Sequence, residues 1–300
     1  MTSAIPFKQD LSIKPLVMAF FDKDTNTFSY VVRDPTSKAC AIVDSVTDID
    51  YPSGSISHEG ADDIIQYVKD NDLTVEWLLE THVHADHLSA ATYLKEHVGG
   101  NIGIGEKIRV VQKLFGKIFN AGPEFKRDGS QFDRLFSDGD SYKIGNMTGY
   151  AMATPGHTPA CMTYVIGNAA FVGDTLFMPD GGTARADFPG GDAKTLYRSI
   201  KRLLSLPPDT LLYMCHDYCP GDRPPEHVTT VAKEKQHNIH ANDSIEEAQF
   251  VKMREERDAT LGMPRLILPS LQVNMRAGHL PPPEDNDKIY LKIPINAFKK

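Results

Sequence analysis

The chain has 300 residues, of which 41% are hydrophobic and 24% charged, so it has enough apolar material for the core of an ordinary globular protein. Its net charge is −8, and no run of Lys and Arg forms a basic footprint, so we expect no nucleic-acid or membrane partner. Four scattered cysteines are too few for a disulfide framework, and no segment resembles a signal peptide; we therefore expect reduced thiols and a cytoplasmic location.

The first third of the chain predicts a β-layer followed by helices. Short apolar runs separated by turn residues are typical of a strand meander, and they occur at 16–21, 28–32 and 41–43. Residues 61–72 begin with acids and space their apolar side chains at helical intervals, which predicts an amphipathic helix. An apolar strand at 75–79 then leads into a polar loop, and a helical pattern with a Gly-Gly stop follows.

The rest of the chain repeats this alternation of strands and helices. Further strands are predicted at 101–104, 148–153, 162–166, 169–172 and 210–215, and further helices at 107–119, 192–204, 226–237 and 243–259. Two successive batches of strands and helices predict an α+β fold in which two sheets pack face to face with helices outside, an α/β/β/α sandwich. We expect a single domain over residues 1–300, with a helical and Pro-rich C-terminal extension from about residue 220.

The strongest chemical signal is the loop after the strand at 75–79. It holds four side chains that can bind a metal within six positions, namely His82, His84, Asp86 and His87. Neutral imidazole with carboxylate is a ligand set for zinc or non-haem iron. Alternatively, Asp86 caps the helix that follows, but this would not account for the three histidines.

Three more candidate ligands follow predicted strands. His157 stands in the turn Thr-Pro-Gly-His-Thr, where Pro and Gly impose a fixed geometry. Asp174 ends an apolar strand, where a carboxylate is costly unless it is paired or bound to a metal. His216 ends the strand predicted at 210–215. Four strand ends that each deliver His or Asp favour one metal site over four coincidences.

The order of these motifs, HxHxDH, then TPGHT, then GDT, then a strand-terminal His, resembles the metallo-β-lactamase superfamily over about residues 16–220. Asp44 matches the structural Asp that this family carries after an early strand. Likeness to glyoxalase II implies two metals: one on His82, His84 and His157, the other on Asp86, His87 and His216, with Asp174 as the bridge.

A closer resemblance covers the segments 182–188, 193–197, 215–218 and 274–278, which are similar to the persulfide dioxygenases related to the ethylmalonic encephalopathy protein. It implies one Fe(II) per chain, held by His82, His157 and Asp174, with the other four candidates hydrogen-bonded around the site. The implied reaction oxidises the sulfane sulfur of glutathione persulfide, or of a similar thiol persulfide, to sulfite with O₂. The likeness also implies a homodimer.

Arg185 and Tyr197 are our candidates for binding the thiol, because a guanidinium can hold a carboxylate by two parallel bonds and a phenol can donate a third. The alternative interpretation makes Arg185 one half of a surface ion pair with Asp187 and makes Tyr197 a core aromatic. We expect Asp187 to orient Arg185. Cys161, Cys215 and Cys219 are interpreted as structural.

The alternative function is a hydrolase of thioesters or lactones with two zinc ions per chain, in which a metal-bridging hydroxide attacks a carbonyl. The ligand set alone does not distinguish it from a dioxygenase. A metal-stabilised binding protein without catalysis is disfavoured, because no ligand is missing.

Overall fold

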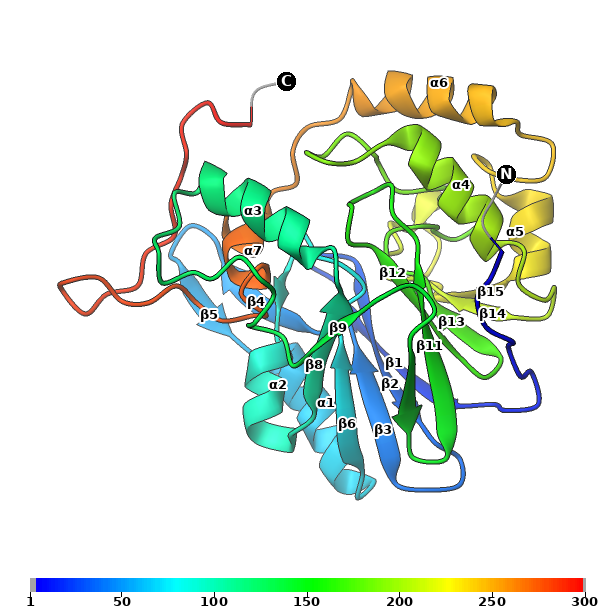
Figure 1. Cartoon of the computed structure of the whole chain (residues 1–300), viewed down its shortest axis with the longest axis horizontal. Helices are drawn as coiled ribbons and strands as arrows, with labels where there is room; N and C mark the ends of the chain where they lie inside the picture. The colour runs from blue at the N-terminus through cyan, green and yellow to red at the C-terminus, as the bar shows by residue number, and fades with distance from the viewer. Residues whose placement is uncertain (1–3, 299–300) are drawn as a thin grey trace.

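Two sheets face one another in the computed structural model, which describes residues 4–298 (Figure 1). The first sheet has the order β1 (Leu16–Asp22), β2 (Thr27–Arg33), β3 (Ala39–Val43), β6 (Thr74–Leu79), β8 (Asn101–Gly105) and β9 (Arg134–Phe136). The second has the order β10 (Ser141–Ile144), β11 (Met147–Ala153), β12 (Met162–Ile166), β13 (Ala169–Phe171), β14 (Leu211–Tyr213) and β15 (Val228–Thr230). A small third sheet joins β5 (Ser55–Ser57), β4 (Val46–Asp50) and β7 (Leu88–Ser89).

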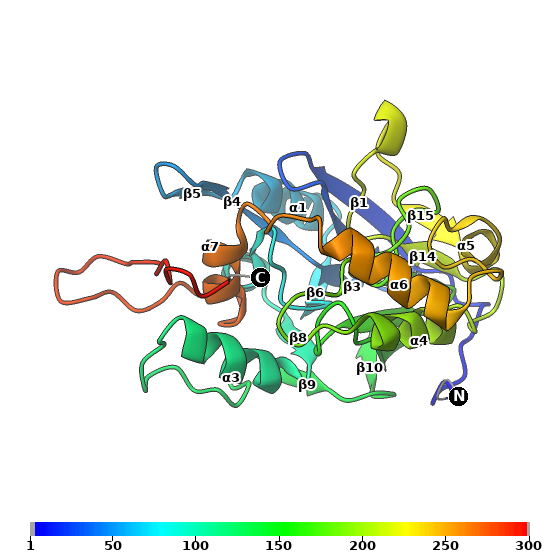
Figure 2. The same cartoon turned by 90° about the horizontal axis from the view of Figure 1, so that it is seen from above.

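The helices cover the outer faces of the two large sheets. Those packed with the first sheet are α1 (Glu59–Asp70), α2 (Ala91–Val98), α3 (Ile108–Ile118) and α7 (Ile267–Asn274). Those packed with the second are α4 (Ala193–Leu203), α5 (Val231–His237) and α6 (Glu247–Asp258), and a short 3₁₀ turn, η1, spans Pro220–Asp222. Figure 2 shows α6 lying alongside α4. Among the described residues, no helix combines the length and the apolar character that crossing a bilayer requires.

Side chains that point alternately to the two faces of each strand build three apolar layers. In β2, Val31 packs with the helices outside the first sheet, whereas Tyr30 and Val32 point into the space between the sheets. In β12, Val165 packs under α4, whereas Tyr164 points back between the sheets. Because successive side chains of a strand point to opposite faces, a sheet buried on both faces needs apolar residues throughout. These layers confirm the predicted α/β/β/α sandwich.

One prediction of local structure and one alternative interpretation were wrong. The helix predicted at 226–237 is helical only from Val231, because the residues before it form β15, which pairs antiparallel to β14. Asp86 does not cap a helix, because α2 begins at Ala91 and the residues between them form β7. The sequence analysis did not predict the three short strands of the third sheet. It also did not predict β9 and β10, which belong to the large sheets, or helix α7.

Candidate metal centre

An aspartate from one strand fixes the histidine-rich loop that leaves the next. β3 and β6 are parallel neighbours, so Asp44 after β3 and Thr81 after β6 meet at the same edge. The Asp44 carboxylate accepts hydrogen bonds of 2.8 Å from both the main-chain N–H and the hydroxyl of Thr81. Its Oδ1 also lies 3.0 Å from Nε2 of His84. All three residues are buried, so the loop begins in a defined conformation.

Two glycines aim the ligands that come from the second sheet. Gly156 (φ 142°) precedes His157, and Gly173 (φ 53°) precedes Asp174. A Cβ on Gly156 would overlap the main chain of Leu196 in α4, and one on Gly173 would lie 2.6 Å from Oγ1 of Thr81. Since glycine alone combines positive φ with such a close approach at no steric cost, both turns depend on it.

The first group of ligands consists of His82, His157 and Asp174. Their ligating atoms all lie within 4.8 Å of one another, and the three side chains are buried. The Nε2 atoms of His82 and His157 lie 4.0 and 3.6 Å from Oδ2 of Asp174. Two imidazoles and one carboxylate thus converge on a single point.

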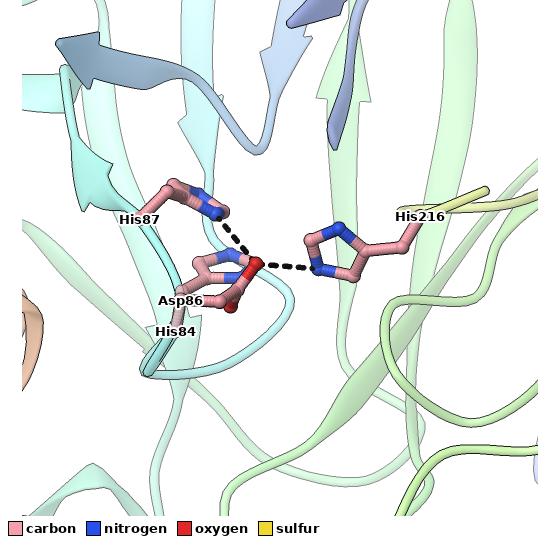
Figure 3. Close-up of side chains that lie close together, drawn as sticks. All are labelled: His84, Asp86, His87 and His216. Carbon is pink, nitrogen blue, oxygen red and sulfur yellow. Dashed lines mark hydrogen bonds and ion pairs between the residues drawn. The ribbon is translucent and has the colours of Figure 1, made fainter. Parts of the chain in front are cut away.

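The second group lies next to the first and consists of His84, Asp86, His87 and His216 (Figure 3). Nε2 of His216 lies 3.2 Å from Oδ2 of Asp86 and 3.4 Å from Oδ1 of Asp174. Asp174 therefore stands between the groups, with one carboxylate oxygen toward each. The structure brings together all seven residues that the sequence singles out as ligands, but it groups His84 with Asp86, His87 and His216 rather than with His82 and His157 as the likeness to glyoxalase II implies.

Unsatisfied polar atoms show that these residues fit a metal. The buried atoms without a hydrogen-bond partner include His82 Nε2, His84 Nδ1, His87 Nε2, His216 Nε2 and Asp174 Oδ1. The opposite ring nitrogens have partners: Nδ1 of His82 lies 3.0 Å from the Thr81 hydroxyl, and Nε2 of His84 lies 3.0 Å from Oδ1 of Asp44. In His157, Nδ1 lies 2.8 Å from the carbonyl oxygen of Arg185. A buried polar atom without a partner is unfavourable, and a metal ion would satisfy this set.

The protonation states of three of the ligands also suit metal binding, whereas for His216 the effect of burial is outweighed by Asp86 and Asp174, which raise its pKa. Burial, reinforced by neighbouring imidazoles, lowers the pKa of His82 and of His84 well below the usual value, so both rings are neutral at pH 7. Burial would raise the pKa of Asp86, but His216 and His87 together bring it well below its usual range. Neutral imidazole and ionised carboxylate are the forms that bind metals.

A cavity of about 410 Å³ opens over His157 and Asp174. Arg185 lines it and forms the expected pair with Asp187, with Nε and Nη2 at 2.6 and 2.9 Å from the two carboxylate oxygens. Nη1 of the same side chain donates a 2.6 Å hydrogen bond to the carbonyl of Gly262. Arg185 is thus both a half of an ion pair and part of the cavity wall.

Tyr197 is not brought to this cavity. Its hydroxyl donates a 2.8 Å hydrogen bond to the carbonyl of Ile245, and its ring packs against Phe250 between α4 and α6. A different tyrosine, Tyr218, lines the cavity and stacks on the ring of His216, with centroids 5.9 Å apart. The sequence signal that could have identified Tyr218 is its position two residues after the candidate ligand His216. All four cysteines are free.

An α/β/β/α sandwich with His and Asp ligands at its strand ends defines a metal-dependent enzyme of the metallo-β-lactamase type. Residues 22–216 match the family model described as the Metallo-beta-lactamase superfamily, and the chain belongs to this superfamily.

Three similar proteins extend this result. The chain is 58% identical to a "Probable metallo-hydrolase" of Burkholderia pseudomallei (strain 1710b), over 94% of this chain and 99% of that protein. It is 31% identical to the mitochondrial persulfide dioxygenase ETHE1 of Homo sapiens, over 88% of this chain and 89% of that protein. The crystal structure of ETHE1 from Myxococcus xanthus superposes with a TM-score of 0.70 at 29% identity, covering 88% of this chain and all of that one.

Proposed function

We propose that the protein is a persulfide dioxygenase that oxidises the sulfane sulfur of glutathione persulfide, or of a similar thiol persulfide, to sulfite. The observation that carries the proposal is the convergence of His82, His157 and Asp174 beneath a cavity. Two histidines and one carboxylate are the ligand set of non-haem Fe(II) oxygenases, and this set leaves coordination positions open. The similarity to a persulfide dioxygenase over most of the chain supports the same function.

In this reaction a persulfide, O₂ and water give a thiol and sulfurous acid, which ionises to sulfite. The sulfane sulfur loses four electrons, and O₂ gains four. Bound Fe(II) would supply the place where sulfur and O₂ meet and the route by which electrons pass between them.

The protein's own residues orient the ligands and shape the cavity. The carbonyl of Arg185 fixes the ring of His157, and the hydroxyl of Thr81 does the same for His82. The rings of Phe177 and Phe188 give the cavity an apolar lining. Asp187 and Gly262 together take three of the donors of Arg185, so the others are available to a carboxylate of the thiol.

A second candidate is a two-zinc hydrolase of thioesters or lactones. It is favoured by the grouping of Asp86, His87 and His216, the ligand set that the likeness to glyoxalase II implies for a second metal, and by the unsatisfied Nε2 atoms of His87 and His216. Nε2 of His216 lies within 3.4 Å of a carboxylate oxygen of Asp174, the implied bridge. High identity to a relative named as a metallo-hydrolase favours it too. In that enzyme a pair of metals would activate water and stabilise the oxyanion.

Oxygen uptake tests the two candidates against each other. Protein loaded anaerobically with Fe(II) is given glutathione persulfide, O₂ consumption is followed with an electrode, and sulfite is assayed at the end. We expect equimolar uptake and sulfite with one iron per chain, and neither iron binding nor uptake in Asp174→Ala. Two zinc ions per chain, no uptake, and hydrolysis of a thioester or lactone would overturn the proposal in favour of the hydrolase.

A further inference from the structure

Two arginines for which the described part of the chain offers no ion-pair partner lie at the mouth of the cavity. Arg257, in α6, and Arg265, just before α7, both line it and are exposed. Neither forms an ion pair with any residue between positions 4 and 298. Because the whole chain carries a net charge of −8, unpaired positive charge at this mouth is a local exception that attracts anions.

The other arginines of the cavity differ from these two. Arg185 is paired with Asp187, and Arg254 lies 2.6 Å from Asp258 while donating a 3.0 Å hydrogen bond to the carbonyl of Thr183. Arg254 is buried, so its charge holds the cavity wall together. The free positive charge at the mouth therefore belongs to Arg257 and Arg265.

The cavity changes in character from the metal centre to its mouth. His157 and Asp174 lie at one end of the cavity, and Phe188 and Met263 line it with apolar side chains. The loop 259–266, which includes Arg265, forms part of the wall at the other end. This loop is anchored, because the Gly262 carbonyl accepts its hydrogen bond from Arg185. A ligand that fills the cavity would thus place its reacting atom at the metal centre and an anionic group near the arginines.

One exposed acid also lines the cavity. Asp24 lies in the turn between β1 and β2, and it forms no ion pair with a described residue. A carboxylate there would accept the ammonium group of an amino-acid-like ligand. Unpaired charges of both signs favour a zwitterionic acid over a neutral ligand.

We propose that Arg257 and Arg265 form a carboxylate-binding subsite that selects which thiol is presented to the metal centre. The class of ligand is a thiol carrying carboxylates at a distance from its sulfur, in preference to a neutral or cationic thiol. That the ligand reacts through a persulfide rests on the proposed function. The subsite itself binds the carboxylates of the ligand, which do not react. Both arginines are specificity-determining residues.

Binding of an unreactive probe tests the subsite. The metal-loaded protein is titrated with S-methylglutathione in a calorimeter, as are Arg257→Gln, Arg265→Gln and the double variant. We expect each single change to raise Kd about tenfold, because a charge-assisted hydrogen bond is lost, and the double change to raise it further. Added salt should weaken binding to the unaltered protein more than to the double variant.

A matched control separates the subsite from general surface charge. Lys252→Gln removes a positive charge from an exposed position of α6 whose partner is Glu256, and Lys252 does not line the cavity. Its Kd should equal that of the unaltered protein. A second probe, 2-(methylthio)ethanol, is neutral and has no carboxylate, so its binding should not respond to either arginine change.

The outcomes distinguish the two proposals. If S-methylglutathione binds the double variant as tightly as the unaltered protein, or does not bind the unaltered protein, the subsite is overturned, even where glutathione persulfide supports oxygen uptake. If no persulfide supports uptake but the arginine changes raise Kd as expected, the proposed reaction is overturned and the carboxylate-binding subsite stands.

Discussion

Nδ2 of Asn274 donates a 2.8 Å hydrogen bond to the carbonyl oxygen of His84, which lies 190 positions earlier in the chain. The same amide donates to the carbonyl of His87 at 2.8 Å, and its Oδ1 accepts a 2.8 Å hydrogen bond from the N–H of Ser89. Asn274 is buried at the end of α7. One side chain from outside the ligand-bearing strands therefore holds the shape of the metal-binding loop.

Asn274→Ala should weaken both the fold and metal binding. The change leaves two buried carbonyls and one buried N–H without partners, and each costs about 1–3 kcal/mol. Loss of hydrogen bonds that orient metal ligands typically lowers the affinity of the site for its metal about 10- to 100-fold. Urea unfolding and competition with a chelator measure the two effects. Asn286→Ala, in the exposed tail, is the control and should change neither; unaltered metal affinity in Asn274→Ala would contradict this role.

Gly156→Ala should destabilise the protein and lower its metal content, because the new Cβ overlaps the main chain of α4 and displaces the turn that carries His157. We expect a loss of more than about 2 kcal/mol in urea unfolding. Gly221→Ala is a matched control, since Gly221 also has positive φ (68°) but has open space around its Cβ position. Equal losses in the two variants would show that backbone strain, rather than the contact with α4, is responsible.

Arg185→Ala should raise the apparent KM for the persulfide about tenfold or more while the protein keeps its metal. The change removes a cation from the cavity wall and releases the carbonyl of Gly262. Arg185→Lys should recover little, because an ammonium cannot reproduce the two-bond contact with Asp187. Steady-state kinetics and metal analysis of both variants provide the check; an unchanged KM in Arg185→Ala would rule out its role in binding.

His240 should make stability depend on pH in the acid range. Burial, together with Arg254 and Arg257, lowers the pKa of His240 to about 4, and Nδ1 of the neutral ring accepts a 3.1 Å hydrogen bond from the N–H of Thr183. The folded-state pKa lies below the unfolded value of about 6.5, so this contribution is complete above pH 6.5 and is lost as the pH falls toward 4.

The measurement for His240 is the free energy of unfolding at several pH values. The difference in stability between the unaltered protein and His240→Gln should shrink as the pH falls from 6.5 to 4. His279→Gln, at an exposed position, should follow the unaltered protein throughout. A constant difference between the protein and His240→Gln would contradict the lowered pKa.

Sequence patterns predicted the sandwich because its strands are buried on both faces and therefore appear as short continuous apolar runs. Candidate ligands could be found because each follows such a run, as His216 follows β14. β15 was missed although Val228, Thr229 and Thr230 are β-branched, because a helical pattern follows them directly. Helix α7 was missed because it is buried on nearly every side, mixes polar with apolar residues and contains Pro269, so no helical period stands out.

Contacts between distant segments could not be read from local pattern. The hydroxyl of Tyr197 contacts a carbonyl 48 positions away, and nothing near position 197 indicates this. In the same way, Asn274 stands in an apolar stretch and gives no local sign that it contacts the loop at His84. Such roles depend on tertiary packing, which a single sequence does not display.

The tether from Asn274 also sets an order of events during synthesis. When a ribosome has released the chain as far as His216, every candidate ligand is present, yet the loop that holds three of the histidines has no support from α7. We therefore expect the centre to reach its final form only after α7 has emerged and docked, and a nascent chain stalled before position 274 to hold its metal more weakly than the finished protein.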